Sequence, residues 1–179
     1  MSKNIIICGL DRTGKDTQCD NLFSYFNGDP QKSPARILRS TKITNQLKPG
    51  YERYYTEMFK GFSNSGFNHL YNRFHLDEYV YSVLYKNYDP NYIWDIEKNH
   101  ILQNGQDDII MFLLLDNPES AIKRDDGLGY TSKIDGIAKE KKLFEDAFET
   151  SIIKNKYIIN IQDFDLNTDK AFEFIKSKL

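Results

Sequence analysis

The segment Gly9-Leu10-Asp11-Arg12-Thr13-Gly14-Lys15 is the most informative stretch of this 179-residue sequence. An isoleucine-rich apolar run at 3–8 precedes it, as expected for a strand that is buried on both faces. A stretch with helical character follows at about 15–26, and Asn27-Gly28-Asp29-Pro30 ends it. The segment is therefore predicted to be a glycine-containing loop between a strand and a helix.

Outward from this segment, apolar runs alternate with amphipathic stretches. Strands are predicted at 35–40, 66–74, 108–116 and 157–161, and helices at 45–62, 76–88, 92–102, from 118, 134–154 and from 168. The run at 108–116 is the strongest strand signal, and 66–74 is weaker by composition. Such alternation requires crossover connections, so it predicts one α/β domain over 1–179 with a five-stranded parallel sheet flanked by helices. Ligands of such sheets bind beyond the carboxyl ends of the strands.

Composition and charge narrow the functional classes. Hydrophobic residues make up 40% and charged residues 28%, as in globular proteins. The 24 Lys and Arg against 26 Asp and Glu give a net charge of −2, whereas dedicated nucleic-acid binders usually carry a basic excess. The apolar runs at 4–10 and 109–115 are too short to cross a membrane. Cys8 and Cys19 fit neither a disulfide framework nor a zinc pattern, so we expect two buried thiols and a cytoplasmic location.

The loop segment matches the pattern G-x-x-x-x-G-K in the strand–loop–helix context that this pattern requires. Its glycines allow successive backbone N–H groups to face phosphates, and the helix N-terminus adds a favourable dipole. Lys15 would reach the β- and γ-phosphates. This context disfavours a turn that merely caps a helix. The residues predicted to bind ATP are Gly9, Leu10, Asp11, Arg12, Thr13, Gly14, Lys15, Asp16 and Thr17.

The position after the lysine departs from the usual pattern. It is normally Ser or Thr, whose hydroxyl coordinates Mg²⁺, but here it is Asp16, followed by Thr17. Asp16 could ligate Mg²⁺ with a carboxylate oxygen, directly or through water. It could equally be an acidic residue of the first helical turn with no role in metal binding. Thr17 is the second candidate ligand, although its hydroxyl fits a position facing the phosphates or the helix backbone better.

Three segments resemble thymidylate kinases. Asp11-Arg12-Thr13-Gly14-Lys15-Asp16-Thr17-Gln18 is similar to their Asp-Arg-x-Gly-Lys-[Ser/Thr]-Thr-Gln segment, and Asn72-Arg73-Phe74 to their Asp-Arg-Tyr. Leu115-Asp116-Asn117-Pro118-Glu119-Ser120-Ala121-Ile122-Lys123-Arg124 is similar to Leu-Asp-x-x-Pro-Glu-x-Ala-x-x-Arg, which leads into a lid. The resemblance implies a three-layer P-loop kinase fold with a lid at about 124–133. It also implies an enzyme that uses ATP and Mg²⁺ to convert dTMP to dTDP.

The resemblance implies roles for individual residues. Asp11 would contact the sugar hydroxyl, Arg12 would assist phosphoryl transfer, and Arg73 would hold the acceptor phosphate. Because the transfer brings several negative charges together, it needs fixed cations, and arginine suits this task. The predicted catalytic residues are Asp11, Arg12, Lys15, Arg73 and Arg124. The predicted acceptor-site residues are Asp11, Arg39, Phe59, Arg73, Phe74 and Tyr81, although aromatic residues at helical spacing more often belong to a core.

Besides Asp16, three further features depart from the family pattern. Asn72 stands where the family has an aspartate. Asp77 or Glu78, one turn further on, could replace that carboxylate, although acidic residues on helices usually face solvent. Arg39 ends the second predicted strand without the proline that follows in the family, and Arg124 is the one arginine of the stretch that resembles the lid.

The leading hypothesis is a deoxynucleoside monophosphate kinase for dTMP or a related or modified pyrimidine nucleotide. One alternative is a deoxynucleoside kinase, which Arg73 disfavours, and another is a kinase acting on a nucleotide within DNA, which the net charge disfavours. A nucleotide-binding protein without activity is the third, suggested by Asp16 and Asn72 together. The Asn-Lys-x-Asp segment of a GTPase is missing from the sequence. Dimers are common in the family, so the resemblance also allows a homodimer.

Overall fold

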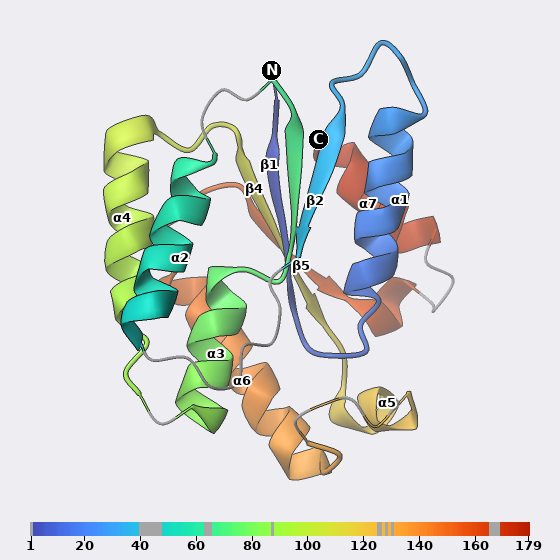
Figure 1. Cartoon of the computed structure of the whole chain (residues 1–179). Helices are drawn as coiled ribbons and strands as arrows, with labels where there is room; N and C mark the ends of the chain where they lie inside the picture. The colour runs from blue at the N-terminus through green and yellow to red at the C-terminus, as the bar shows by residue number, and fades with distance from the viewer. Residues whose placement is uncertain are drawn as a thin grey trace.

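The computed structural model describes residues 2–39, 48–62, 66–86, 88–124, 127, 129, 131–164 and 169–179. Its centre is a sheet with the strand order β2-β3-β1-β4-β5 (Figure 1). The strands are β1 (Asn4–Gly9), β2 (Ala35–Arg39), β3 (Asn68–Asn72), β4 (Ile109–Leu115) and β5 (Lys156–Asn160). Each neighbouring pair is parallel. The predicted five-stranded parallel sheet is therefore confirmed.

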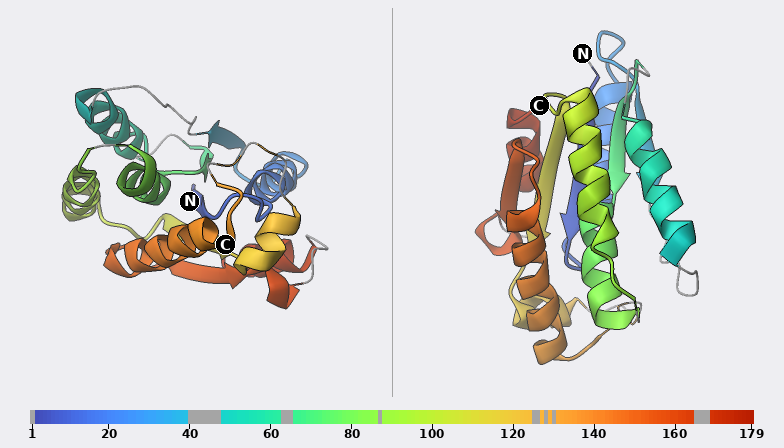
Figure 2. Two further views of the ribbon diagram at one scale, coloured as in Figure 1. Left: turned by 90° about the horizontal axis from the view of Figure 1, so that it is seen from below. Right: turned by 90° about the vertical axis from the view of Figure 1, so that its left-hand side faces the viewer.

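Helices cover both faces of the sheet (Figures 1 and 2). On one face lie α1 (Lys15–Asn27) and α7 (Asp169–Ser177). On the other lie α2 (Lys48–Lys60), α3 (His75–Tyr85), α4 (Tyr92–Asn104) and α6 (Ile134–Thr150). A short helix, α5 (Pro118–Lys123), follows β4, and a 3-10 helix, η1 (Ile161–Phe164), follows β5. Each crossover between consecutive strands thus contains a helix, which is the α/β arrangement that the sequence predicts.

The two cores lie on opposite faces of the central strand β1. Ile6 and Cys8 belong to the core beneath α2, α3, α4 and α6, whereas Ile5 and Ile7 belong to the core beneath α1 and α7. This division follows from the alternation of side chains along a strand. Cys8 and Cys19 are buried free thiols, as predicted. In the described part of the chain, no helix is both long and apolar enough to span a membrane.

The predicted elements match the observed ones closely. Every predicted strand lies within two residues of the observed bounds, including the weak run at 66–74, which contains β3. The helix predicted at 134–154 is too long, because α6 ends at Thr150. Glu97 of α4 causes this end, since its carboxylate accepts hydrogen bonds from the Ser151 hydroxyl at 2.8 Å and the Ile152 N–H at 2.7 Å. The predicted residues 45–47 lie outside the described residues, and η1 was not predicted.

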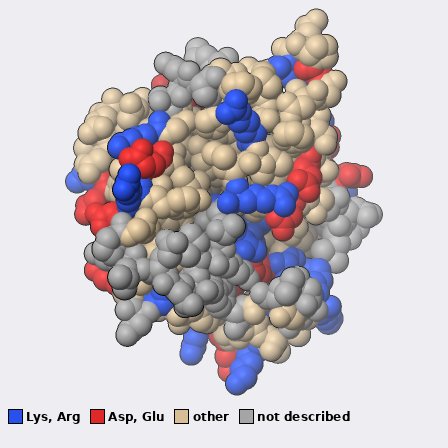
Figure 3. Space-filling view, in the orientation of Figure 1, with Lys and Arg blue, Asp and Glu red and all other residues tan. Residues whose placement is uncertain are grey.

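The register of the sheet brings three loops to one edge. Ile7 pairs with Asn72, and Gly9 pairs with Leu114, so β1, β3 and β4 end side by side. The loop after β1 and helix α5 lie in the lower part of the molecule in Figure 1, and Arg73 follows β3 directly. On the face in Figure 3, basic and acidic side chains are interspersed, in keeping with the small net charge.

Candidate active site

The loop between β1 and α1 depends on two glycines. Gly9 has a φ of 126°, and a Cβ atom there would lie 2.0 Å from the carbonyl oxygen of Leu114. Only glycine therefore allows β1 to pass so close to β4. Arg12 and Gly14 are left-handed, with φ of 67° and 80°, and α1 starts immediately afterwards at Lys15. Such alternation of backbone conformation curls a loop so that its N–H groups can face an anion.

Lys15 lies in the centre of this loop. Its side chain is 4% exposed, and its ammonium group donates hydrogen bonds to the carbonyl oxygens of Gly9, at 2.9 Å, and Leu10. The nearest carboxylate oxygen, of Asp11, is 3.9 Å away. Burial lowers the pKa of Lys15, and the negative charge of Asp11 opposes that change. The loop thus fixes a lysine ammonium group beside its own backbone.

Asp11 lies between two cations. Its Oδ1 accepts a hydrogen bond of 2.8 Å from Nη2 of Arg73, in addition to the contact with Lys15. Arg73 follows β3 directly, and its backbone N–H donates to the carbonyl oxygen of Ile7 at 2.9 Å. Burial alone would lower the pKa of Arg73, but the charges of Asp11 and Asp77 outweigh burial and raise it. The arginine is therefore charged, and its position relative to the loop is fixed.

The structure corrects the expectation that Asp77 and Glu78 face solvent, because their exposed fractions are only 4% and 3%. Oδ2 of Asp77 accepts a hydrogen bond from the N–H of Phe74 at 3.1 Å, whereas Oδ1 has no hydrogen-bond partner among the described residues. Burial raises the pKa of Asp77 to about 6, although Lys15 and Arg73 act in the opposite direction. Asp77 is therefore a buried acid within electrostatic reach of Lys15 in the loop and of Arg73 after β3.

Glu78 belongs to a different environment. Its carboxylate accepts hydrogen bonds from Ser82 at 3.0 Å, Tyr92 at 3.0 Å, Lys86 at 2.6 Å and Tyr88. These partners lie on α3, on α4 and in the connection between them. Glu78 therefore joins α3 to α4 and does not supply the carboxylate that is missing at position 72.

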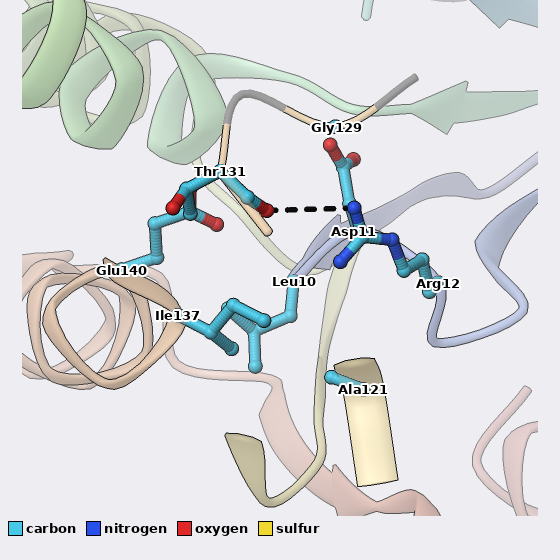
Figure 4. Close-up of a pocket in the computed structure, with 8 residues that line it drawn as sticks. All are labelled: Leu10, Asp11, Arg12, Ala121, Gly129, Thr131, Ile137 and Glu140. Atoms are coloured by element: carbon cyan, nitrogen blue, oxygen red, sulfur yellow. Dashed lines mark hydrogen bonds between the residues drawn. The ribbon is translucent and has the colours of Figure 1, made fainter. Parts of the chain in front are cut away.

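The segment predicted as a lid contacts the loop through two arginines, of which Figure 4 draws Arg12. Arg124 donates a hydrogen bond of 3.0 Å from Nε to the carbonyl oxygen of Arg12, and its Nη2 pairs with the buried carboxylate of Asp116. Nη2 of Arg12 donates to the carbonyl oxygen of Thr131 at 3.4 Å. A Cβ atom on Gly129 would lie 2.4 Å from the same nitrogen. Described parts of the segment 124–133 therefore pack directly on Arg12.

Glu140 is a site residue that was not predicted from the sequence. It lies on α6 with an exposed fraction of 4%, and it accepts a hydrogen bond of 2.5 Å from the hydroxyl of Tyr85. Burial raises its pKa. In Figure 4 it lines a cavity of about 10 Å³ together with Leu10, Asp11, Arg12, Ala121, Gly129, Thr131 and Ile137. The signal in the sequence was an acid at helical spacing from buried Ile137 and Phe144.

The two departures at positions 16 and 72 lie in contact. Nδ2 of Asn72 donates a hydrogen bond of 2.5 Å to Oδ1 of Asp16. Asn72 is 3% exposed, whereas Asp16 and Thr17 are exposed in the first turn of α1. Thr13 bonds within the loop instead, donating to the carbonyl oxygen of Leu10 at 2.7 Å. The carboxylate of Asp16 thus has a fixed partner on the neighbouring strand.

The other four predicted acceptor-site residues differ in their surroundings, and Tyr81 is within electrostatic reach of Asp11 and Arg73. Phe59 and Phe74 are 1% and 0% exposed, and their ring centroids are 4.9 Å apart in an aromatic core. Tyr81 is also buried, with its ring 5.9 Å from that of Phe144. Arg39 is more than half exposed and pairs with Asp20 of α1 at 2.9 Å. Contact between these four residues and a substrate remains a prediction.

No protein-family model and no curated protein matches this sequence. Solved structures do match. The YorR protein of Bacillus subtilis in complex with phosphorylated GDP has a TM-score of 0.75 and 14% identity, over 98% of this chain and 94% of that chain. Thymidylate kinase from Ehrlichia chaffeensis has a TM-score of 0.62 and 15% identity, over 99% of both chains. Deoxyadenosine kinase from M. mycoides with bound dCTP has a TM-score of 0.59 and 18% identity, over 98% of this chain and 97% of that chain.

Together with the strand order and the loop geometry, these likenesses show that the chain has the P-loop nucleotide-kinase fold. They confirm the predicted resemblance at the level of the fold.

Proposed function

We propose that this chain is a nucleotide kinase that transfers the γ-phosphoryl group of ATP, with Mg²⁺, to a deoxynucleoside monophosphate of the dTMP type. The supporting observation is the convergence of cations from separate segments of the chain. Lys15 and Arg73 both pair with the carboxylate of Asp11, and Arg124 donates a hydrogen bond to the backbone carbonyl oxygen of Arg12. Catalysis of phosphoryl transfer consists mainly of positioning and charge neutralisation, which is what such a group provides.

The loop 9–15 and the start of α1 would bind the phosphates of ATP. The ammonium group of Lys15 has two carbonyl oxygens of the loop as partners. Phosphate oxygens would replace them as partners, and hydrogen bonds between two charged groups are the stronger kind. Since Lys15 is already inside the loop, the exchange requires movement of one side chain rather than of the fold.

Arg73 would hold the phosphate of the acceptor. A guanidinium group has five N–H donors in a planar fork, and Asp11 accepts from the Nη2 nitrogen of this fork. The contact restrains the guanidinium group, and other N–H groups of the fork would bind phosphate oxygens. Arg12 and Arg124 would neutralise the charge on the transferred group, and Asp11 would contact the sugar, as the resemblance implies.

The site fits the way in which proteins hold Mg²⁺ with nucleotides. Mg²⁺ is usually bound by one or two carboxylates together with phosphates and water. Asp16 supplies an exposed carboxylate next to Lys15. Among the described residues, there is no group of three or more His, Cys, Asp or Glu side chains that could hold a metal. When bound, Mg²⁺ would neutralise negative charge on the phosphates.

A panel of acceptors tests this proposal. The purified chain is given ATP and Mg²⁺ with dTMP, the other deoxynucleoside monophosphates, 5-substituted deoxyuridine monophosphates, thymidine, or DNA, and the products are separated by anion exchange. We expect a diphosphate from one of the monophosphates. Lys15→Ala should abolish the product, and Lys98→Ala, at an exposed position on α4, should not.

Other outcomes would contradict the proposal. Phosphorylation of thymidine alone would identify a nucleoside kinase, and label on DNA alone would identify a kinase for nucleotides within a chain. Binding of ATP without product from any acceptor would indicate a nucleotide-binding protein.

A further inference from the structure

Asp16 and Asn72 are 56 positions apart in the sequence, but their side chains share a hydrogen bond of 2.5 Å. Asp16 lies in the first turn of α1, and Asn72 is the last residue of β3. Asn72 is fixed in the sheet between Ile7 of β1 and Arg39 of β2. A buried amide of a rigid strand therefore holds an exposed carboxylate of the helix that follows the phosphate-binding loop.

The chemistry of this contact ties the two residue types to each other. An aspartate at position 72 would place a second carboxylate at hydrogen-bond distance from Asp16, and two such groups cannot both be ionised without a large cost. An amide at position 72 is a donor that an ionised Asp16 accepts without this cost. In the thymidylate-kinase pattern, the acid stands at the position of Asn72 and a hydroxyl at the position of Asp16. Each arrangement therefore has one carboxylate in this contact: at position 72 in the family pattern and at position 16 in this chain.

The exposures of the two residues indicate which one meets the ligand. The hydrogen bond occupies Oδ1 of Asp16, and among the described residues no hydrogen bond to Oδ2 is found. Asn72 is 3% exposed, whereas Asp16 is exposed and follows Lys15 directly. A carboxylate oxygen is the hard ligand that Mg²⁺ prefers. Residues that bind and orient such a ligand commonly change metal affinity by 10–100-fold when they are lost.

We propose that Asp16 is the magnesium-binding carboxylate of this chain and that Asn72 is its positioning residue, the two having exchanged the roles of the family pattern. This inference rests on the proposed nucleotide-kinase function. Because one carboxylate binds Mg²⁺ weakly, phosphates of the nucleotide must supply further ligands. The affinity of the chain for the nucleotide should therefore be higher with Mg²⁺ than without it.

The test measures the affinity of the full chain for the β,γ-imido analogue of ATP by calorimetry, once with Mg²⁺ and once with EDTA. In the unmodified chain, Mg²⁺ should increase the affinity. Asp16→Asn and Asn72→Ala should each reduce that increase about tenfold or more, without weakening the binding in EDTA. Asp20→Asn, one turn further along α1, is the matched control and should leave the increase unchanged. The electron paramagnetic resonance spectrum of Mn²⁺ bound with the same analogue should change in Asp16→Asn.

The exchange itself is tested by the double variant Asp16→Ser/Asn72→Asp. It should regain at least part of the Mg²⁺-dependent increase that Asp16→Ser loses, so the two substitutions should be non-additive. Full metal dependence in Asp16→Asn would overturn the role of Asp16, and full dependence in Asn72→Ala would overturn positioning. A double variant no better than Asp16→Ser would overturn the exchange. If the unmodified chain binds no nucleotide with or without Mg²⁺, the proposed function fails, and this inference fails with it.

Discussion

Replacing Asp77 with asparagine should change how the stability of the protein depends on pH. The folded protein holds this carboxyl group buried with a pKa of about 6, whereas its ordinary value is 3.8. Between these values the folded chain keeps a proton that the unfolded chain has released. The free energy of unfolding therefore falls as the pH rises through this window. Asparagine removes the titrating group and keeps an oxygen that can accept the hydrogen bond from Phe74.

The size of the effect follows from the two pKa values. The interval between 3.8 and about 6, at 1.36 kcal/mol per pH unit, corresponds to about 3 kcal/mol. The free energy of unfolding of Asp77→Asn, relative to the unmodified chain, should rise by most of this amount, about 2 kcal/mol, from pH 4 to pH 7. The new amide N–H group replaces Oδ1, which has no hydrogen-bond partner among the described residues, and its contribution to stability is independent of pH. The slope with pH, and not the absolute value, is therefore diagnostic.

The measurement is urea unfolding followed by the fluorescence of Trp94, at pH values from 4 to 8 under reducing conditions and without nucleotide. Asp95→Asn, an exposed position on α4, controls for the loss of one carboxylate. A constant difference between Asp77→Asn and the unmodified chain across the pH range would refute the reasoning. It would mean that the carboxyl group of Asp77 titrates alike in the folded and unfolded chains.

Three further predictions concern the loop and its contacts. Gly9→Ala should lower the free energy of unfolding by about 2–4 kcal/mol in urea titrations, because its Cβ would collide with the carbonyl oxygen of Leu114; a change below 1 kcal/mol would show that β1 and β4 can separate cheaply. Gly129→Ala should lower kcat while leaving thermal unfolding nearly unchanged, since its Cβ would displace Arg12, and an unaltered kcat would argue against that contact in turnover. Arg73→Ala should raise KM for the monophosphate more than KM for ATP in steady-state assays, and equal changes would contradict its assignment to the acceptor.

Local patterns in the sequence were sufficient for the fold. Strands such as β1 and β4 are continuous apolar runs, and the pattern of glycines and lysine at 9–15 marks the turn between β1 and α1. Both signals depend on neighbouring residues only. They therefore predict which elements form and, because the carboxyl ends of parallel strands share one edge, where the site lies.

Contacts between distant segments could not be predicted in this way. The burial of Asp77 results from the packing of α3 against the loop, and that of Glu140 from the packing of α6, so neither follows from local spacing. The contact between Asp16 and Asn72 depends on the register between β1 and β3. Phe59, a predicted acceptor-site residue, packs its ring against that of Phe74, and its contact with a substrate stays a prediction.

The left-handed backbone at Arg12 and Arg73 has a consequence for selection experiments. Among the described residues, these two are the non-glycine positions with positive φ, at 67° and 65°. For most residues this conformation costs about 1–2 kcal/mol, which glycine avoids. A glycine at either position would remove this backbone cost, and the gain would offset part of the stability lost with the guanidinium contacts. In a library sorted by abundance or heat resistance, glycine should therefore be retained more often than other replacements at both positions, and those variants would lack the side chains on which phosphoryl transfer is proposed to depend.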